Sequence, residues 1–362
     1  GEPTRAGSKV LAGAPPAGED APVVRRLRAA GAVIVAKTNM SEFAFSGVGY
    51  NPHFGTPGNP ADRSRVPGGS SSGAAVAVAD GMCEIAIGTD TGGSTRIPAA
   101  LCGVVGFKPS KWRVPTEGAF PLSFTLDSVG PLARTVAECA LADAVMAGEE
   151  PKIPEPAPLT GLRFALPQNR SFTPHDDMVR AAIQRGADRL RKAGVNLYEA
   201  PFPFLDDMIA ANPKGGFPVP EAYSIHRERL AARGDEVDQH IRSRIERGGG
   251  ILAADYIDLV RIRARLARAI DGWLADFDAM VMPTTPIVAG RIADAEASET
   301  FVRMNTALLS NTSIVNFFDL CAISVPLPRD GGLPVGLMLV ARNGHDHRLF
   351  RIAVAVETLL RR

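Results

Sequence analysis

The sequence predicts an α/β protein in which helices cover a mixed or parallel central β-sheet. Short apolar runs rich in β-branched residues alternate along the chain with longer stretches of helical periodicity. Glycine (36 residues) and proline (29 residues) are more frequent than usual, which indicates many turns and close backbone approaches. The length of 362 residues fits either two or three domains or one large α/β domain.

The first part of the chain alternates helices and strands around glycine-rich loops. Residues 20–30 place apolar side chains at helical spacing and end at a glycine, so a helix is expected. Residues 32–36 (AVIVA) are wholly apolar and mostly β-branched, which is typical of a buried strand. The alanine-rich residues 74–79 favour a helix, and residues 85–87 (IAI) indicate a second buried strand. A loop at residues 88–94 leads into another helical run.

Residues beyond 150 continue this alternation after a proline-rich surface linker at residues 151–158. Apolar runs mark the strands, and apolar positions at helical spacing mark the helices. In order, the expected elements are strand 162–166, helix 177–194, strand 195–198, helix 251–277, strand 279–282, strand 323–327, a turn at 330–332, a strand near 335–341 and a closing helix at 346–360.

Composition and charge exclude several classes of protein. Forty Lys and Arg residues against 39 Asp and Glu give a formal charge of +1, which argues against direct nucleic-acid binding and a polybasic membrane patch. No apolar run is as long as a membrane span. The cysteines stand singly, and no Cys/His cluster has zinc-site spacing, so we expect no metal site, buried free thiols and a reducing, cytoplasmic compartment. These cysteines are Cys83, Cys102, Cys139 and Cys321.

Two glycine- and serine-rich loops, residues 67–73 (PGGSSSG) and 88–94 (GTDTGGS), flank one helix–strand unit. Folds of the α/β class place ligands at loops that follow buried strands. The backbone N–H groups of Gly92 and Gly93 have no side chains in the way and can point at an oxyanion that develops beside Ser94. A nucleophilic serine needs a base, and no histidine lies in a comparable loop. The first loop is therefore the candidate proton relay.

The residues alone allow other interpretations of these loops. GGSSSG by itself could be a flexible linker or a turn. Residues 90–92 (DTG) are similar to the DTG of aspartic proteases, but those enzymes need two carboxylates that share a proton, and the chain has no second DTG. A phosphate-binding loop is disfavoured because neither GxxxxGK[ST] nor a strand-linked GxGxxG occurs.

Residues 67–98, PGGSSSGAAVAVADGMCEIAIGTDTGGSTRIP, resemble the core of the amidase signature family. The resemblance spans nearly the whole chain and is weakest over residues 150–275. It implies one large domain over residues 1–362, with a central mixed β-sheet covered by helices on both faces. The other segments that resemble the family are residues 30–43, 98–109, 126–134, 282–286 and 333–345.

The resemblance implies a Ser–cis-Ser–Lys hydrolase that needs no cofactor. Ser94 matches the nucleophile, and Ser70 matches the bridging serine, which follows a cis peptide bond in the family. Ser94 would attack an amide carbonyl, Ser70 would pass a proton to the leaving amine, and water would clear the acyl-enzyme. The family's oxyanion-hole segment corresponds to the N–H groups of Thr91, Gly92, Gly93 and Ser94. The resemblance also implies three supporting residues, Ser71, Asp90 and Arg96. Asp90 and Arg96 would form an ion pair that stabilises the loop.

The base that the resemblance implies has no counterpart in the sequence. The family's lysine lies in a strand just before the segment that matches residues 1–8, and Lys37 and Lys108 match non-catalytic positions. The chain opens on Gly1-Glu2-Pro3-Thr4, which reads like the middle of a loop. We therefore expect either a longer polypeptide whose N-terminal part is missing here or a degenerate homologue, and the first is favoured because the serines and glycines are intact. The 1–362 polypeptide is expected to lack appreciable amidase activity.

Three functions follow from these observations. The first is a stand-alone amidohydrolase that cleaves a small carboxamide, with a homodimer as a candidate assembly. The second is the amidase subunit of a tRNA-dependent amidotransferase, in which a partner subunit would bind the RNA. The third is a non-catalytic relative that keeps the pocket and has lost the base.

Overall fold

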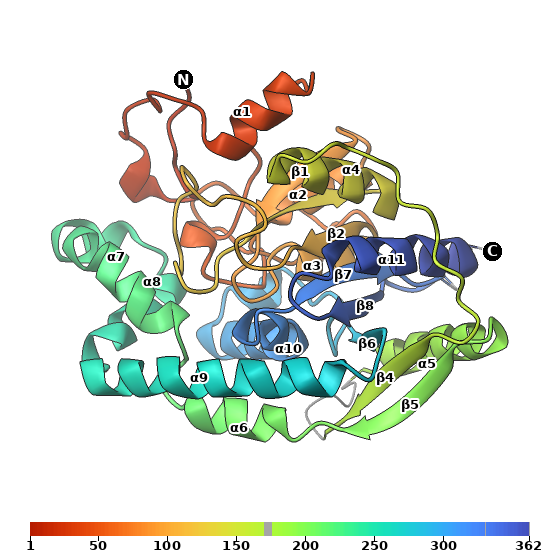
Figure 1. The fold of residues 1–362 in the computed structure, drawn as a ribbon. Coiled ribbons are helices and arrows are strands. Elements are labelled where there is room, and N and C mark those ends of the chain that lie inside the picture. The colour runs from red at the N-terminus through yellow and green to blue at the C-terminus, as the bar shows by residue number, and fades with distance from the viewer. Residues whose placement is uncertain (170–175, 330, 362) are drawn as a thin grey trace.

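In the computed structural model, which describes residues 1–169, 176–329 and 331–361, one eight-stranded sheet runs through the molecule (Figure 1). Strand β4 pairs in parallel with β5 and β6, and the remaining neighbours are antiparallel. The expected mixed sheet is therefore confirmed. Across the sheet the order is β1 (Ile85–Thr89), β3 (Val129–Ala133), β2 (Val105–Lys108), β7 (Cys321–Pro326), β8 (Gly336–Ala341), β6 (Ala279–Pro283), β4 (Arg163–Gln168) and β5 (Asn196–Pro201).

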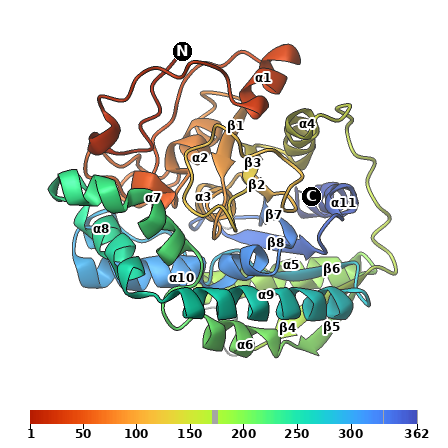
Figure 2. The same ribbon diagram turned by 60° about the vertical axis from the view of Figure 1, so that its left-hand side comes forward.

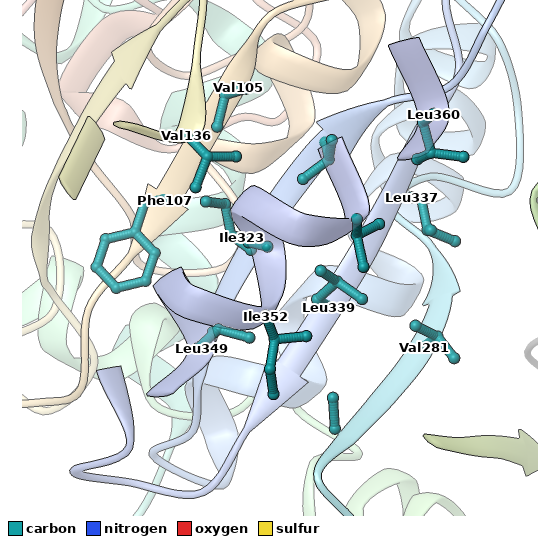
Figure 3. Packing of buried hydrophobic residues seen from close by; sticks show 14 of the residues in the cluster. Val105, Phe107, Val136, Val281, Ile323, Leu337, Leu339, Leu349, Ile352 and Leu360 are labelled. Carbon is teal, nitrogen blue, oxygen red and sulfur yellow. The ribbon is translucent and has the colours of Figure 1, made fainter. Parts of the chain in front are cut away.

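One face of the sheet is covered by α4 (Val136–Ala147), α5 (Asp177–Lys192) and α11 (Asp346–Arg361). Figure 3 shows α11 laid across β7 and β8, with its apolar side chains directed at the sheet. These side chains recur at helical spacing, so a single stripe of the helix is buried. The stripe includes Leu349, Ile352, Ala353, Val356 and Leu360.

The opposite face is covered by helices that also carry the candidate site. They are α3 (Arg96–Cys102), α6 (Phe204–Ala211), α9 (Ala253–Leu274) and α10 (Ser298–Phe317). Helix α9 turns an apolar stripe toward this core and leaves an arginine-rich face outside. The expectation of helices on both faces is confirmed.

A smaller core joins α7 (Pro218–Arg233) and α8 (Gln239–Glu246) to the N-terminal segment (Figures 1 and 2). Here Phe43 and Phe45 pack with apolar side chains of both helices. His226 of α7 is fully buried, its ring centroid lies 4.1 Å from that of Phe43, and neither ring nitrogen has a hydrogen-bond partner among the described residues.

The buried His226 makes stability sensitive to acid. Burial, with a smaller contribution from the Arg229 charge, lowers the pKa of His226 to about 4. The unfolded chain therefore takes up this proton below about pH 6.5, whereas the folded protein resists it down to about pH 4, and folding loses about 3 kcal/mol across that window. His226→Phe should remove this loss, so urea unfolding of both proteins between about pH 7 and about pH 4.5 should give a smaller pH slope for the variant. Parallel pH profiles would contradict the assignment.

The remaining sequence expectations have mixed outcomes. The helices expected near residues 20–30 and 74–79 are α1 (Pro22–Ala29) and α2 (Ser72–Ala79), and the strands and helices expected beyond residue 150 are present as β4, α5, β5, α9, β6, β7, β8 and α11. Residues 151–158 contain no helix or strand and are mostly exposed. The turn expected at 330–332 includes Asp330, which lies outside the described residues. No prediction was made for β2, β3, α4, α6, α7, α8 or α10.

The expectation of a buried strand at residues 32–36 is wrong. The segment forms no strand, and Val33 and Val35 are 85% and 72% exposed. Ala32 N–H donates to Leu27 O, and the backbone then continues without a sheet neighbour among the described residues. Apolar, β-branched composition favours an extended backbone, but burial needs a paired strand and a covering layer, which local composition does not specify.

Candidate active site

Ser94 lies in the loop that connects β1 to α3. The loop covers residues 90–95, and Ser94 is 4% exposed. Gly93, just before it, has φ +135°, and a Cβ atom there would lie 2.1 Å from Thr312 Oγ1. Only glycine accommodates both this backbone conformation and this close approach to α10. The position of Ser94 is therefore fixed by contact between its loop and a distant helix.

Ser70 lies in the second loop, directly before α2. The peptide bond between Gly69 and Ser70 is cis, as the resemblance implied. Gly69 N–H donates to Gly47 O (2.8 Å), and Ser41 N–H donates to Ser70 O (3.1 Å). The segment over residues 41–49 thus holds the Ser70 loop in place.

The structure brings the two loops together through their backbones. Ser71 N–H donates to Ser94 O at 3.2 Å, so the serine-rich loop lies directly beside the nucleophile candidate. Ser71 Oγ donates to Thr89 O (3.4 Å), and Ser72 Oγ donates to Asn39 O (3.3 Å). Both hydroxyls therefore bond to backbone carbonyls around the loop.

Ser70 Oγ is buried and makes no hydrogen bond to any described residue. The side-chain oxygens of Ser41 (Oγ) and Asn39 (Oδ1) are also buried without a partner in the described chain. All three belong to two segments that pair with each other, since Ser41 N–H bonds to Ser70 O and Gly73 N–H bonds to Asn39 O. Buried oxygens of this kind are normally satisfied, so this part of the site is suited to a group that donates several hydrogen bonds.

The predicted ion pair between Asp90 and Arg96 is present and fully buried. Arg96 Nε and Nη2 donate to Asp90 Oδ2 (3.0 Å) and Oδ1 (2.9 Å), which is a bidentate arrangement. Burial acts to raise the pKa of Asp90, but the Arg96 guanidinium, together with the Asn316 hydrogen bond and the Lys108 charge, holds this pKa well below its usual range. Thr95 Oγ1 and N–H also donate to Asp90 Oδ2, so the carboxylate organises the whole loop.

Helix α10 supplies polar contacts that the sequence analysis missed. Thr312 Oγ1 donates to Gly92 O (2.6 Å). Asn316 Nδ2 donates to Asp90 Oδ1 (2.9 Å), and Asn316 Oδ1 accepts from Arg96 Nη2 (2.7 Å). The available signal was the spacing, because Thr312 and Asn316 stand four residues apart on a buried helical face that also carries the polar Asn305.

The candidate oxyanion donors differ in availability. Gly93 N–H already donates to Asp90 Oδ1 (2.8 Å), so it is engaged in holding the loop. The N–H groups of Thr91, Gly92 and Ser94 make no hydrogen bond within the described part of the chain. These three N–H groups are therefore the candidate donors that remain for an oxyanion.

Thr91 links this segment to the loop over residues 119–127. Thr91 Oγ1 donates to Asp127 Oδ1, and Asp127 Oδ2 accepts from Leu122 N–H (2.9 Å) and Ser123 N–H (3.0 Å). Burial raises the pKa of Asp127, while these donors act in the opposite direction. Asp127 therefore joins two loops beside Ser94.

Thr91→Val should test this link. Valine has the shape of threonine without the hydroxyl, so the variant should lose about 1 kcal/mol of stability. It should also react with an acylating ester about tenfold more slowly, because the N–H groups of residues 91 and 92 are held less firmly. The rate of Ser94 acylation checks the prediction, with Thr91→Ser as the matched control that keeps the hydroxyl. Equal acylation rates for the Thr91→Val and Thr91→Ser variants would contradict the prediction.

The lysines are engaged away from Ser70. Lys108 is buried, and its Nζ donates to Pro109 O (2.7 Å) and Leu320 O (3.0 Å). Burial lowers the pKa of Lys108 to about 8. Lys37 is exposed and its Nζ donates to Pro3 O (2.8 Å). No lysine of the described chain bonds to Ser70 Oγ.

The described residues show neither a cluster of metal ligands nor a membrane-spanning helix. No group of three or more His, Cys, Asp or Glu side chains there is arranged to hold a metal ion. None of the helices described is both long enough and apolar enough to cross a membrane. Cys102, Cys139 and Cys321 are buried free thiols as expected, whereas Cys83 is half-buried. Cys102 Sγ lies 3.3 Å from Pro67 O at the base of the serine-rich loop.

Comparisons with known proteins agree with this geometry. The Amidase family model matches residues 1–350. A 2-amino-5-chloromuconic acid deaminase of Comamonas testosteroni is 36% identical over 348 residues, covering 94% of this chain and 74% of the relative. A glutamyl-tRNA(Gln) amidotransferase subunit of Symbiobacterium thermophilum is 33% identical over 373 residues, covering 93% and 76% of the two chains. A solved crystal structure of an amidase superposes with a TM-score of 0.89 at 33% identity, covering 99% of this chain and 82% of that chain.

The match extends far beyond the serine-rich core, since it includes the sheet, both helical layers and the loops that meet at Ser94. The chain therefore belongs to the amidase signature family and is an amidase, a hydrolase that acts on amides.

Proposed function

We propose that this enzyme cleaves the C–N bond of a small carboxamide through an acyl-enzyme on Ser94. Ser94 Oγ attacks the carbonyl carbon while its proton passes to Ser70 Oγ, and the N–H groups of Thr91, Gly92 and Ser94 stabilise the oxyanion. As the C–N bond breaks, Ser70 relays a proton to the leaving amine, and water then hydrolyses the ester and frees Ser94. The observation that carries the proposal is the contact between Ser71 N–H and Ser94 O, which places the two serine loops side by side.

The proton path on this proposal passes through Ser70 Oγ. This hydroxyl is sealed from solvent, and the segment that pairs with its loop carries two further unpartnered oxygens, Ser41 Oγ and Asn39 Oδ1. An ammonium group, with three donors and no acceptor, would satisfy such a set of acceptors. The family resemblance assigns this place to a lysine, and the lysines at 37 and 108 bond elsewhere. In this proposal a neutral amine at this place takes a proton from Ser70 Oγ and holds it as an ammonium group.

The Gly93 N–H group has a different role in this proposal from the one that the resemblance implied. Because it donates to Asp90 Oδ1, it supports the loop and does not contact the oxyanion. Asp90 and Arg96 likewise act on the geometry of the loop, not on the substrate. Ser71 contributes through its N–H group, which joins the two loops.

The substrate class is proposed from the relatives and the closed setting of Ser94. One relative is named for the deamination of 2-amino-5-chloromuconic acid, a small carboxylic acid, and we propose that this enzyme likewise acts on a small molecule. It would work in the cytoplasm without a cofactor, as a monomer or a homodimer. Light scattering measures the molar mass in solution, and a species larger than a dimer would contradict the proposed assembly.

The second candidate is the amidase subunit of a tRNA-dependent amidotransferase. The relative from Symbiobacterium thermophilum favours it, because its name describes such a subunit. Gel filtration of the protein from its native source distinguishes the two candidate functions. A free enzyme that releases ammonia from small amides supports the first candidate, and obligatory co-purification with other subunits supports the second.

A covalent adduct tests the mechanism directly. The protein is mixed with an activated ester, quenched in acid and measured by intact mass, followed by peptide mapping. The expected result is one acyl group on the peptide that contains Ser94. Acylation at another residue, or equal acylation of the Ser94→Ala variant, would overturn the proposal.

A further inference from the structure

We propose that Glu221 of α7 is a positioning residue for acylation, because it holds the loop over residues 119–127 in the place from which Asp127 bonds to Thr91. The proposal rests on the proposed function, since it takes Ser94 as the nucleophile and the N–H group of Thr91 as an oxyanion donor. It assigns a role in the reaction to a side chain outside both serine loops.

The carboxylate of Glu221 is buried and accepts four hydrogen bonds. Glu221 lies in the first turn of α7 and is 1% exposed. Its Oε2 atom accepts from Ser123 Oγ and from Thr125 N–H (3.2 Å). Its Oε1 atom accepts from Thr125 Oγ1 and from the hydroxyl of Tyr256 (2.7 Å). A carboxylate has about four acceptor sites, so both oxygens of Glu221 are fully used.

Ser123 connects Glu221 to Asp127. Besides its hydroxyl contact with Glu221, Ser123 donates its N–H group to Asp127 Oδ2 (3.0 Å), and Asp127 N–H donates back to Ser123 O (2.8 Å). Asp127 Oδ1 accepts from Thr91 Oγ1. An unbroken series of hydrogen bonds therefore leads from Glu221 through Ser123 and Asp127 to the loop that carries Ser94.

The loop over residues 119–127 depends on such outside contacts for its shape. It contains no helix or strand. Lys111 Nζ holds two of its carbonyl groups, Phe124 O (3.0 Å) and Asp127 O (2.8 Å). Glu221 holds its hydroxyl groups and one N–H group, and among the buried carboxylates of the described chain it is the one that bonds to this loop from outside.

Two helices keep the Glu221 side chain in place. Tyr256, which donates to Glu221 Oε1, belongs to α9. The Tyr256 ring packs edge to face against Phe217, the residue before α7, with a centroid distance of 5.6 Å. Phe217 is 1% exposed, so this contact lies in the core. Glu221 is therefore a preorganised anchor, and its contacts transfer the position of the helices to the loop.

Removal of the Glu221 carboxylate should slow acylation without weakening ester binding. Stopped-flow release of nitrophenolate from p-nitrophenyl acetate gives the limiting rate and the half-saturating concentration. In Glu221→Ala the limiting rate should fall about tenfold, because displaced N–H donors stabilise the oxyanion less, whereas the half-saturating concentration should change less than about twofold. A change in the half-saturating concentration alone would overturn the proposal.

Glu221→Gln should rescue most of the rate and stay within about threefold of wild type. The hydroxyl groups of Ser123, Thr125 and Tyr256 can each donate or accept, so glutamine can keep the same contacts. A Glu221→Gln variant as slow as Glu221→Ala would show that the negative charge, and not the positioning of the loop, sets the rate, and would overturn the proposal.

A double-mutant cycle with Thr91→Val tests the path itself. If Glu221→Ala and Thr91→Val break the same path, the double variant should be about tenfold slower than wild type, as each single variant is. A loss of about a hundredfold would mean that the two residues act independently and would overturn the proposal. Ser123→Ala breaks the same path from the loop side, so it gives the same comparison if Glu221→Ala does not fold.

Glu357→Ala is the matched control, because it removes another buried carboxylate. Glu357 is 7% exposed and accepts from Val136 N–H (3.2 Å). It belongs to α11, which lies on the other side of the molecule from α7 (Figures 1 and 2). The control should unfold at a lower urea concentration and still acylate like wild type. A control that is as slow as Glu221→Ala would show that the rate follows general stability, which would overturn the proposal.

Hydrogen exchange measured by mass spectrometry distinguishes this proposal from the proposed function. In Glu221→Ala, peptides that cover residues 119–127 and peptides that cover residues 90–95 should both exchange faster than in wild type. If they do, and Ser94 of the wild type is never acylated, the path from Glu221 stands and the proposed function is contradicted. If Ser94 is acylated in wild type and Glu221→Ala changes neither the exchange of residues 90–95 nor the acylation rate, the path is contradicted and the proposed function stands.

Discussion

Alanine in place of Ser94 is expected to slow hydrolysis of p-nitrophenyl acetate by the enzyme at least about a thousandfold, because the attacking oxygen is removed. An activated ester is the right substrate, since its leaving group departs without a proton. The assay thus reports the attack by Ser94 separately from the proton path through Ser70. The measurement is the release of nitrophenolate, with circular dichroism to show that the variant is folded.

Ser70→Ala is the matched control for the Ser94 prediction. It should retain a larger share of ester hydrolysis than of amide hydrolysis, since only the amide needs a proton delivered to the leaving group. A Ser94→Ala enzyme that still turns over the ester, beside an inactive Ser70→Ala enzyme, would reverse the two assignments.

Replacing Arg96 by methionine is expected to lower the free energy of unfolding by about 3–5 kcal/mol, because it leaves the Asp90 carboxylate buried without its counter-charge. Asp90 and Arg96 are both inaccessible to solvent, and Asp90 retains only the neutral donors of Thr95, Gly93 and Asn316 in the variant. Urea denaturation followed by far-ultraviolet circular dichroism gives the difference.

A double-mutant cycle shows whether the effect comes from the uncompensated charge. Asp90→Asn combined with Arg96→Met should be more stable than Arg96→Met alone, because the charge left behind has been removed. If the double variant is no more stable than the single one, the lost packing of the arginine side chain, and not its charge, explains the result.

The sequence predicted the parts of the fold and site that depend on local pattern. Apolar runs such as residues 85–87 and 279–282 are strands of the sheet, and the amphipathic residues 177–194 are a helix over it. The Asp90–Arg96 pair was also expected, from the positions that the family resemblance matches, and it is present. In each case the determining contacts are short in sequence or follow from one buried face.

Features that depend on distant contacts were missed. Thr312 and Asn316 stabilise the nucleophile loop from more than 200 residues away, and no local pattern connects them with it. The hydrogen bond from Gly93 N–H to Asp90 Oδ1 depends on the backbone conformation of the whole loop, which the sequence does not show. Residues 32–36 have the composition of a buried strand, but composition does not specify a neighbour to pair with.

The bond between Asn316 and Asp90 joins residues that are 226 positions apart in the chain. A ribosome that adds roughly 5–20 residues per second makes Asp90 about 11–45 s before it makes Asn316. During that interval the nascent loop has β1 beside it and lacks the helix that fixes its shape. The loop that carries Ser94 therefore reaches its final shape only after α10 has been made, and in nascent chains released before α10 this loop should not be fixed.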